Sequence, residues 1–172
     1  MSSHTTSKLT FNLGFLLASA VGESRIIELE YPAVKLEEVL LRPLRGQFRA
    51  SHTSQGIMIR GLLYTNAVID CARCTEPFEY KVTLELDDHF YLRDEGPADA
   101  FRIDDSGILD LGPLVREEAI SAVPMQPICA DDCQGLCIEC GQNLNEEDCG
   151  CEPESIDPRF AVLQQLLTQS PN

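Results

Sequence analysis

Eight cysteines are the residues of this 172-residue chain whose type and spacing could do chemistry. They occur as four close pairs, which are Cys71 and Cys74, Cys129 and Cys133, Cys137 and Cys140, and Cys149 and Cys151. The first and third pairs have the C-x-x-C spacing, which presents two thiolates to one side of a metal ion. Zinc in structural sites takes four such soft ligands in a tetrahedron and keeps no position open for water or substrate. The cysteines therefore predict two structural zinc ions.

The four pairs can be combined into two metal sites in more than one way. We prefer a local second site made of the third and fourth pairs, and a first site made of the first and second pairs. The first site would close a long loop, which removes more chain entropy than a local closure does. An alternative combines Cys133, Cys137 and Cys140 with one cysteine of the last pair.

Other uses of the cysteines fit the sequence less well. Four disulfides would need an oxidising compartment, whereas the apolar segment 11–20 is interrupted by Asn12 and Gly14, unlike a secretory signal peptide. A thioredoxin-like centre would place C-x-x-C at a strand-to-helix turn, but Cys74 is followed by Thr75-Glu76-Pro77 and a strand pattern. Iron–sulfur clusters also take four cysteines, although these spacings are not diagnostic of one. We therefore expect a cytoplasmic protein with reduced cysteines.

The segments that must position these cysteines are mainly strands. Between residues 25 and 92 apolar and polar residues alternate, most clearly at 27–31 and 82–87. Residues 46–50 and 57–69 are rich in apolar and β-branched residues, and Ser54-Gln55-Gly56 between them has the composition of a hairpin turn. This succession predicts an α+β fold built mainly on an antiparallel β-sheet or a partly closed barrel.

Two short helices are expected in addition to the strands. The segment 110–123 has a proline in its first turn and apolar residues on one helical face, and it ends at Pro124. A C-terminal helix is expected from about Pro158, again with apolar residues on one face. We accordingly divide the chain into a β-rich core domain with one helix, residues 1–125, and a zinc-binding cysteine-rich module with the C-terminal helix, residues 126–172.

The net charge of −15 is distributed unevenly along the chain. Residues 1–80 carry eight basic and eight acidic side chains, whereas residues 81–172 carry five basic and twenty acidic ones. A uniformly acidic protein repels nucleic acid, but the segment 42–73 holds five arginines against one acid, Asp70. These arginines are candidates for RNA binding if they share a face, and ordinary solvated charges if they do not. They are Arg42, Arg45, Arg49, Arg60 and Arg73.

The sequence contains no pattern typical of an active site. It has no Gly-rich phosphate loop, no H-E-x-x-H and no G-x-S-x-G. His4, His52 and His89 are expected to be surface or core residues, and the short acidic runs are expected to be solvated loops. No apolar run reaches the 18 residues that a transmembrane helix needs. We therefore expect no enzymatic activity, no small-molecule substrate and no membrane association.

The motifs stand in a specific order. A Cys-x-Arg-Cys at the end of a β-rich segment is followed by a helix, a Cys-x3-Cys, the string GLCIECGQNLN at 135–145, C-G-C at 149–151 and I-D-P-R-F at 156–160. This order resembles the YceD family, the large ribosomal RNA subunit accumulation proteins, over roughly residues 13–167. The resemblance implies a role in making or accumulating large-subunit ribosomal RNA through assembly of the large subunit, in a bacterial or plastid setting.

The resemblance also bears on the metal sites and the partners. Some relatives lack the last four cysteines but keep a C-x-x-C and a later pair of ligands, which supports grouping Cys71 and Cys74 with Cys129 and Cys133. One interpretation is a non-enzymatic factor that binds large-subunit rRNA, its precursor or an early ribosomal protein. The alternative is a zinc-stapled acidic adaptor or chaperone for a basic ribosomal protein, without direct RNA contact. A redox switch would require reactive cysteines, whereas zinc normally protects its thiolates.

Overall fold

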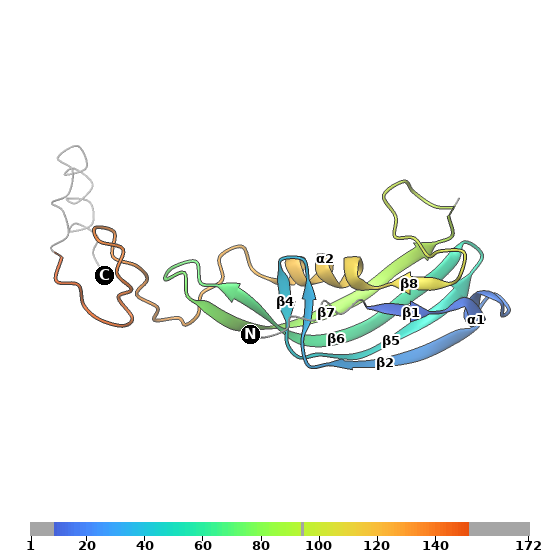
Figure 1. The fold of residues 1–172 in the computed structure, drawn as a ribbon, viewed down its shortest axis with the longest axis horizontal. Coiled ribbons are helices and arrows are strands. Elements are labelled where there is room, and N and C mark those ends of the chain that lie inside the picture. The colour runs from blue at the N-terminus through green and yellow to red at the C-terminus, as the bar shows by residue number, and fades with distance from the viewer. Residues whose placement is uncertain (1–8, 94, 152–172) are drawn as a thin grey trace, which may run out of the picture. The chain divides into compact units, whose positions relative to one another are not determined.

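The computed structural model describes residues 9–93 and 95–151. Two helices are present in this part of the chain, α1 (Gly14–Leu17) and α2 (Gly112–Ala122) (Figure 1). The strands are β1 (Thr10–Asn12), β2 (Ser24–Tyr31), β3 (Val34–Leu36), β4 (Val39–Leu41), β5 (Leu44–Thr53), β6 (Gly56–Asp70), β7 (Pro77–Tyr91) and β8 (Ile108–Asp110).

The described residues form two compact units. The first unit contains residues 9–72 and 76–129, and the second contains residues 73–75 and 130–151. The helices and strands named above lie in the first unit, whereas the described residues of the second form turns, irregular segments and an isolated bridge. The sequence-based division after residue 125 stays a prediction.

Six strands form one antiparallel sheet around the long hairpin of β6 and β7. These two strands pair over fifteen residues each, from Gly56 to Asp70 on β6. On its other side β6 pairs with β5 and then with β4, and the sheet continues to β2 beyond β5 and to β3 beyond β4. The β5–β6 turn lies where the sequence predicted it, because Thr53 pairs directly with Gly56. Only glycine fits there, since φ is +149° and a Cβ would lie 2.1 Å from the Phe90 carbonyl oxygen.

The core of the first unit lies on one face of this sheet. Alternate residues of the central strands are almost fully buried there, as a period of two requires, and they include Phe48, Ala50, Ile57, Ile59, Leu63, Leu84 and Leu86. Helix α2 buries Leu114, Val115 and Ala119 in the same core. The small β1–β8 pair adds to it, with the ring of Phe11 edge-on to that of Phe48 at a centroid distance of 5.2 Å. The opposite face of the sheet is left exposed.

This mostly antiparallel sheet with two helices confirms the predicted fold class. The helix expected at 110–123 is α2, whereas α1 was not expected because four residues are too few to show a helical period. The helix expected from about Pro158 lies outside the described residues. Among the described strands β2 pairs only with β5 and β7 pairs with β6 and not with β2, so the sheet is open rather than a closed barrel. Neither described helix has the length and apolar composition needed to cross a membrane.

Candidate functional site

The first group of thiols contains one C-x-x-C pair and the two cysteines that follow α2. The Sγ atoms of this first cluster all lie within 4.8 Å of one another, and they belong to Cys71, Cys74, Cys129 and Cys133. Cys71 follows the last residue of β6, and its sulfur accepts a hydrogen bond from the Cys129 backbone N–H at 3.4 Å. The adjacent Ala72 N–H donates to the Pro127 carbonyl at 2.7 Å. All members but Cys129 are at most 5% exposed, so this cluster is largely buried.

Arg73, one of the five candidate arginines, supports the backbone beside this cluster. Its Nη1 donates to the carbonyl of Cys133 at 2.9 Å and to that of Asp131 at 3.4 Å. Its own carbonyl accepts a hydrogen bond from the Leu136 N–H at 3.2 Å. Gly135 packs closely here with φ +78°, and a Cβ on it would lie 3.1 Å from the Arg73 carbonyl oxygen. The guanidinium of Arg73 is therefore engaged in holding the turn around Cys133.

The second group of thiols is local in sequence and more exposed. The Sγ atoms of this second cluster again all lie within 4.8 Å, and they belong to Cys137, Cys140, Cys149 and Cys151. The Cys137 N–H donates to the Gln142 carbonyl at 2.8 Å, and the Gly141 N–H donates back to the Cys137 carbonyl at 2.9 Å. Gly141 and Gly150 have φ of +76° and +66°, which residues with a Cβ rarely adopt. The two glycines thus allow the tight turns that bring these four sulfurs together.

Both clusters fit a tetrahedral metal ion. Zn–S bonds of about 2.3 Å place the four sulfurs about 3.8 Å apart, which is inside the 4.8 Å found in each cluster. Soft thiolates in a tetrahedral set of four favour zinc or an iron–sulfur centre. The structure therefore has two four-cysteine clusters that could bind metal ions. The cysteines are grouped as in the preferred interpretation of the sequence, with the first and second pairs in one cluster and the third and fourth pairs in the other.

The thiols of the second cluster differ in acidity in the metal-free chain. Backbone N–H groups of Cys140 and Glu139 lower the pKa of Cys137 to about 7. Hydrogen bonds with Cys149 and Cys140 raise the pKa of Cys151 to about 12. Near neutral pH Cys137 is therefore partly ionised while Cys151 keeps its proton. Because a metal ion requires thiolates, metal binding to this cluster must release protons.

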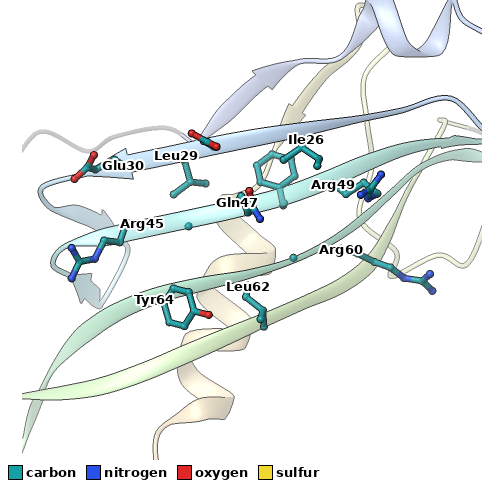
Figure 2. Close-up of a pocket in the computed structure, with 13 residues that line it drawn as sticks. Ile26, Leu29, Glu30, Arg45, Gln47, Arg49, Arg60, Leu62 and Tyr64 are labelled. Carbon is teal, nitrogen blue, oxygen red and sulfur yellow. The ribbon is translucent and has the colours of Figure 1, made fainter.

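The exposed face of the sheet forms an open groove of about 760 Å³, lined by β2, β5 and β6 (Figure 2). Arg45 and Arg49 of β5 and Arg60 of β6 line this groove, and Arg49 stands directly opposite Arg60 in the strand register. Leu62 and Tyr64 of β6 lie on the same face and are 43% and 51% exposed. Cationic and aromatic side chains are thus collected on one surface that has no covering element among the described residues.

Carboxylates beside these arginines reduce the positive charge of the groove. The Nε atom of Arg60 lies 2.8 Å from a carboxylate oxygen of Asp87. Arg45 stands opposite a glutamate of β2 in the register. Arg49 instead donates to the neutral hydroxyl of Ser24 at 3.2 Å. Arg49 is therefore the arginine of this face best placed to bind an anionic partner. Arg60 stands directly opposite it on β6, and the two like charges repel each other.

Three of the five candidate arginines line this groove, and Arg42 and Arg73 are not among its lining residues. Arg42 forms an ion pair with Glu79 at 2.9 Å, and Arg73 belongs to the second unit. The exposed Leu62 and Tyr64 were not found from the sequence, because apolar residues occupy both faces of β6 and hide which face is exposed. Asn145, which donates a hydrogen bond to the sulfur of Cys133, was also missed. Asn145 belongs to the motif 135–145, but asparagine is not a usual zinc ligand, so the sequence did not single it out.

Comparison with protein families matches residues 59–167 to the family described as Large ribosomal RNA subunit accumulation protein YceD. The chain belongs to the YceD family. The matched segment covers more than half of the chain and contains all eight cysteines, as well as β7, α2 and most of β6. The resemblance seen in the order of the motifs is therefore confirmed, and the description of the family concerns large ribosomal RNA subunit accumulation.

Relatives of this YceD-family chain occur in bacteria and in a plant chloroplast. An uncharacterised protein of Mycobacterium tuberculosis is 33% identical over 124 residues, which cover 69% of this chain and 59% of that protein. The uncharacterised protein YlbN of Bacillus subtilis is 25% identical over 135 residues, covering 75% of this chain and 77% of YlbN. The Arabidopsis thaliana protein named Large ribosomal RNA subunit accumulation protein YCED homolog 1, chloroplastic, is 31% identical over 61 residues, covering 36% and 19%.

The chain thus spans about 59% of the length of the mycobacterial relatives that it matches. No solved structure matches it.

Proposed function

We propose that this chain is a non-enzymatic cytoplasmic factor that holds two zinc ions and supports accumulation of large-subunit rRNA by binding that RNA or its precursor. Membership of the YceD family supports the link with this RNA. The observation that carries a direct contact is the placement of Arg45, Arg49 and Arg60 on one exposed face beside Tyr64. Involvement in assembly of the large ribosomal subunit follows from the same link.

The composition of the two clusters supports a structural rather than a catalytic role for the metal. Each cluster supplies four sulfur ligands, so a bound zinc ion has no open position at which water or substrate could be activated. The zinc ions would then stabilise the fold around residues 71–74 and 129–151 and leave recognition to the surface.

The chemistry of the sheet face supports single-stranded rather than helical RNA. Arginine guanidinium groups donate paired hydrogen bonds to phosphate oxygens. An exposed aromatic ring such as that of Tyr64 offers a platform on which a base stacks. Stacking on a side chain requires a base that is not already stacked in a duplex, which is the case in loops, bulges and ends. A looped segment of large-subunit rRNA is therefore the expected ligand.

Replacing Arg45 and Arg49 together by glutamine tests this contact. Each lost phosphate contact to a single strand should lower the slope of log affinity against log salt concentration by about 0.7. Arg25→Gln is a matched control, because this exposed arginine of β2 projects to the other face of the sheet. Binding to fragments of large-subunit rRNA should be measured at several salt concentrations. Equal affinities and slopes for the double variant and wild type would contradict RNA binding at this face.

A second candidate is the acidic adaptor for a basic ribosomal protein, which the charge of the second unit favours. Among its described residues this unit has one basic residue, Arg73, against six exposed acids, which are Asp131, Asp132, Glu139, Glu146, Glu147 and Asp148. Each zinc ion bound by four thiolates adds a formal charge of about −2. Such a surface attracts a basic protein.

Binding experiments with nuclease-treated proteins separate the two candidates. The adaptor requires saturable binding of a basic ribosomal protein without RNA, with weakening at high salt. Replacing Glu146 and Glu147 by glutamine should weaken that binding, whereas replacing Arg45 and Arg49 should not. RNA binding combined with no affinity for basic ribosomal proteins would exclude the adaptor.

A further inference from the structure

Asn145 connects the loop of the second cluster to a sulfur of the first. Its Nδ2 atom lies 3.4 Å from the Sγ of Cys133 and donates a hydrogen bond to it. Asn145 itself stands in the sequence between Cys140 and Cys149 of the second cluster. The side chain is not a metal ligand, so its place in the 135–145 motif is not explained by the two clusters alone.

The orientation of this amide is fixed by its other hydrogen bonds. Its Oδ1 accepts the backbone N–H of Gln134 at 2.8 Å, and a backbone N–H can only donate. The oxygen must therefore point to Gln134 and the NH₂ group to the sulfur. The second N–H of that group donates to Oδ1 of Asn143 at 2.8 Å, and the same oxygen accepts the Asn145 backbone N–H at 3.1 Å. Asn143 thus holds Asn145 in place.

The segment that carries both asparagines is folded back by the turn that closes the second cluster. The Cys137 N–H donates to Gln142, and the Leu144 N–H donates to the Gly135 carbonyl at 2.9 Å. Leu136 and Asn143 form an isolated antiparallel bridge. Cys140 and Cys149 bracket this segment, so their ligation to one metal ion would restrict its two ends. The position of the Asn145 amide on Cys133 therefore depends on the closure of the second cluster.

We propose that Asn145 is a positioning residue that couples the two metal sites, so that metal binding at the second cluster strengthens metal binding at the first. This proposal rests on the proposed function, in which both clusters hold zinc. A thiolate bound to zinc among three others carries excess negative charge, and an N–H donor directed at its sulfur stabilises that charge. By thermodynamic linkage, occupation of the first cluster must strengthen binding at the second by the same factor.

Loss of a hydrogen bond to a metal ligand typically costs 10- to 100-fold in metal affinity. We expect a loss of about this size at the first cluster for Asn145→Asp, which keeps the oxygen that accepts from Gln134 but replaces the donor to Cys133 with a carboxylate oxygen. Disabling the second cluster by Cys137→Ser and Cys140→Ser should produce a similar loss at the first. Gln142→Ala is the matched control, since its side chain donates to the Glu147 carbonyl in the same loop and not to a sulfur.

The experiment is a zinc competition titration of the full chain against a chromophoric chelator, with Co²⁺ absorption as a second probe of the sulfur ligands. Asn145→Asp is introduced into wild type and into the Cys137→Ser/Cys140→Ser background. The Cys71→Ser/Cys74→Ser variant, which lacks the first cluster, identifies the titration step that belongs to zinc binding at the second cluster. Coupling predicts that Asn145→Asp weakens the first cluster 10- to 100-fold in wild type and less than about threefold in the background that lacks the second cluster.

Four outcomes would overturn the inference. Unchanged zinc affinity of the first cluster in Asn145→Asp would show that the hydrogen bond does not matter. An equal loss in both backgrounds would show that Asn145 supports the first cluster without coupling it to the second. An equal loss in Gln142→Ala would assign the effect to the loop as a whole. Wild type that binds fewer than two zinc ions would refute the zinc part of the proposed function, and the inference with it, before any variant is compared.

Discussion

Removal of metal from the first cluster should destabilise the β-sheet unit. Cys71 directly follows β6 and Cys129 follows α2, and both belong to this unit. The perturbations are addition of a strong zinc chelator to wild type and the double substitution Cys71→Ser/Cys129→Ser. Both remove the ion that ties these two distant points of the chain together.

The expected loss can be worked out from the length of the loop. The segment from Cys71 to Cys129 contains 59 residues. Closing a loop of this length in the unfolded chain costs about 4 kcal/mol in the chain-entropy treatment that is used for cross-links. The folded chain has already brought the two cysteines together, as the 3.4 Å hydrogen bond between them shows. The folded state should therefore bind zinc at this cluster more favourably than the unfolded state by at least about 4 kcal/mol.

The second cluster provides the comparison. Its inner loop, from Cys140 to Cys149, contains ten residues, and closing it costs about 3 kcal/mol. These residues lie outside the β-sheet unit. Cys137→Ser/Cys140→Ser should therefore leave the unfolding free energy of the sheet within about 1 kcal/mol of wild type, apart from the coupling through Asn145.

Urea denaturation followed by far-UV circular dichroism measures the sheet directly, and the chain has no tryptophan to report on it by fluorescence. Chelator should lower the unfolding free energy of wild type by at least about 4 kcal/mol and have no effect on Cys71→Ser/Cys129→Ser. A change below about 1 kcal/mol in wild type, or an equal loss in Cys137→Ser/Cys140→Ser, would refute the loop-closure reasoning.

Three further predictions concern the sheet unit. Phe48→Ala should cost about 3–5 kcal/mol in urea denaturation because the ring is 1% exposed and packs on Phe11; a loss below 1 kcal/mol would contradict its place in the core. Gly56→Ala should cost more than about 1 kcal/mol, since the added methyl meets the Phe90 carbonyl. Gly22→Ala also places alanine at a positive φ, +98°, but nothing lies near the added methyl, so it should cost less than Gly56→Ala. Burial lowers the pKa of His89, whose Nδ1 has no partner. The folded state then binds fewer protons than the unfolded one, so stability should fall as pH drops below about 6.5, and the pH dependence of the thermal midpoint should be flatter in His89→Gln.

The β5–β6 hairpin and the grouping of the cysteines could be predicted because short-range patterns indicate them. The Ser54-Gln55-Gly56 turn indicated the β5–β6 hairpin, and the close cysteine pairs left few groupings that are local in the chain. The shared face of Arg49 and Arg60 was beyond reach, because the exact turn length sets the register and a slip of one residue exchanges the two faces. In the structure the turn begins after Thr53, and this places the two arginines directly opposite each other.

The positions of the remaining arginines could not be predicted because their partners are distant in sequence. Arg42 pairs with Glu79, 37 residues further along, and Arg73 donates to a carbonyl 60 residues away. Composition alone placed both with Arg45 and Arg49 in one basic segment. The structure shows that arginines close together in the sequence do not all line one surface, because Arg45, Arg49 and Arg60 line the groove whereas Arg42 and Arg73 do not. Local charge counts therefore overestimate the size of a basic patch.

Metal binding changes the charge argument for the two candidate partners. Four neutral thiols that bind one zinc ion as thiolates acquire a formal charge of about −2. The second cluster lies in the unit whose described residues already include six exposed acids and one arginine. Zinc should therefore make this unit more repulsive to RNA and more attractive to a basic protein. The arginines of the sheet face are unaffected in number and lie in the other unit. If RNA is the ligand, we expect it to bind to the sheet face. Removal of zinc from the second cluster should then leave the RNA affinity unchanged or raise it. If a basic protein is the ligand, the same treatment should weaken its binding.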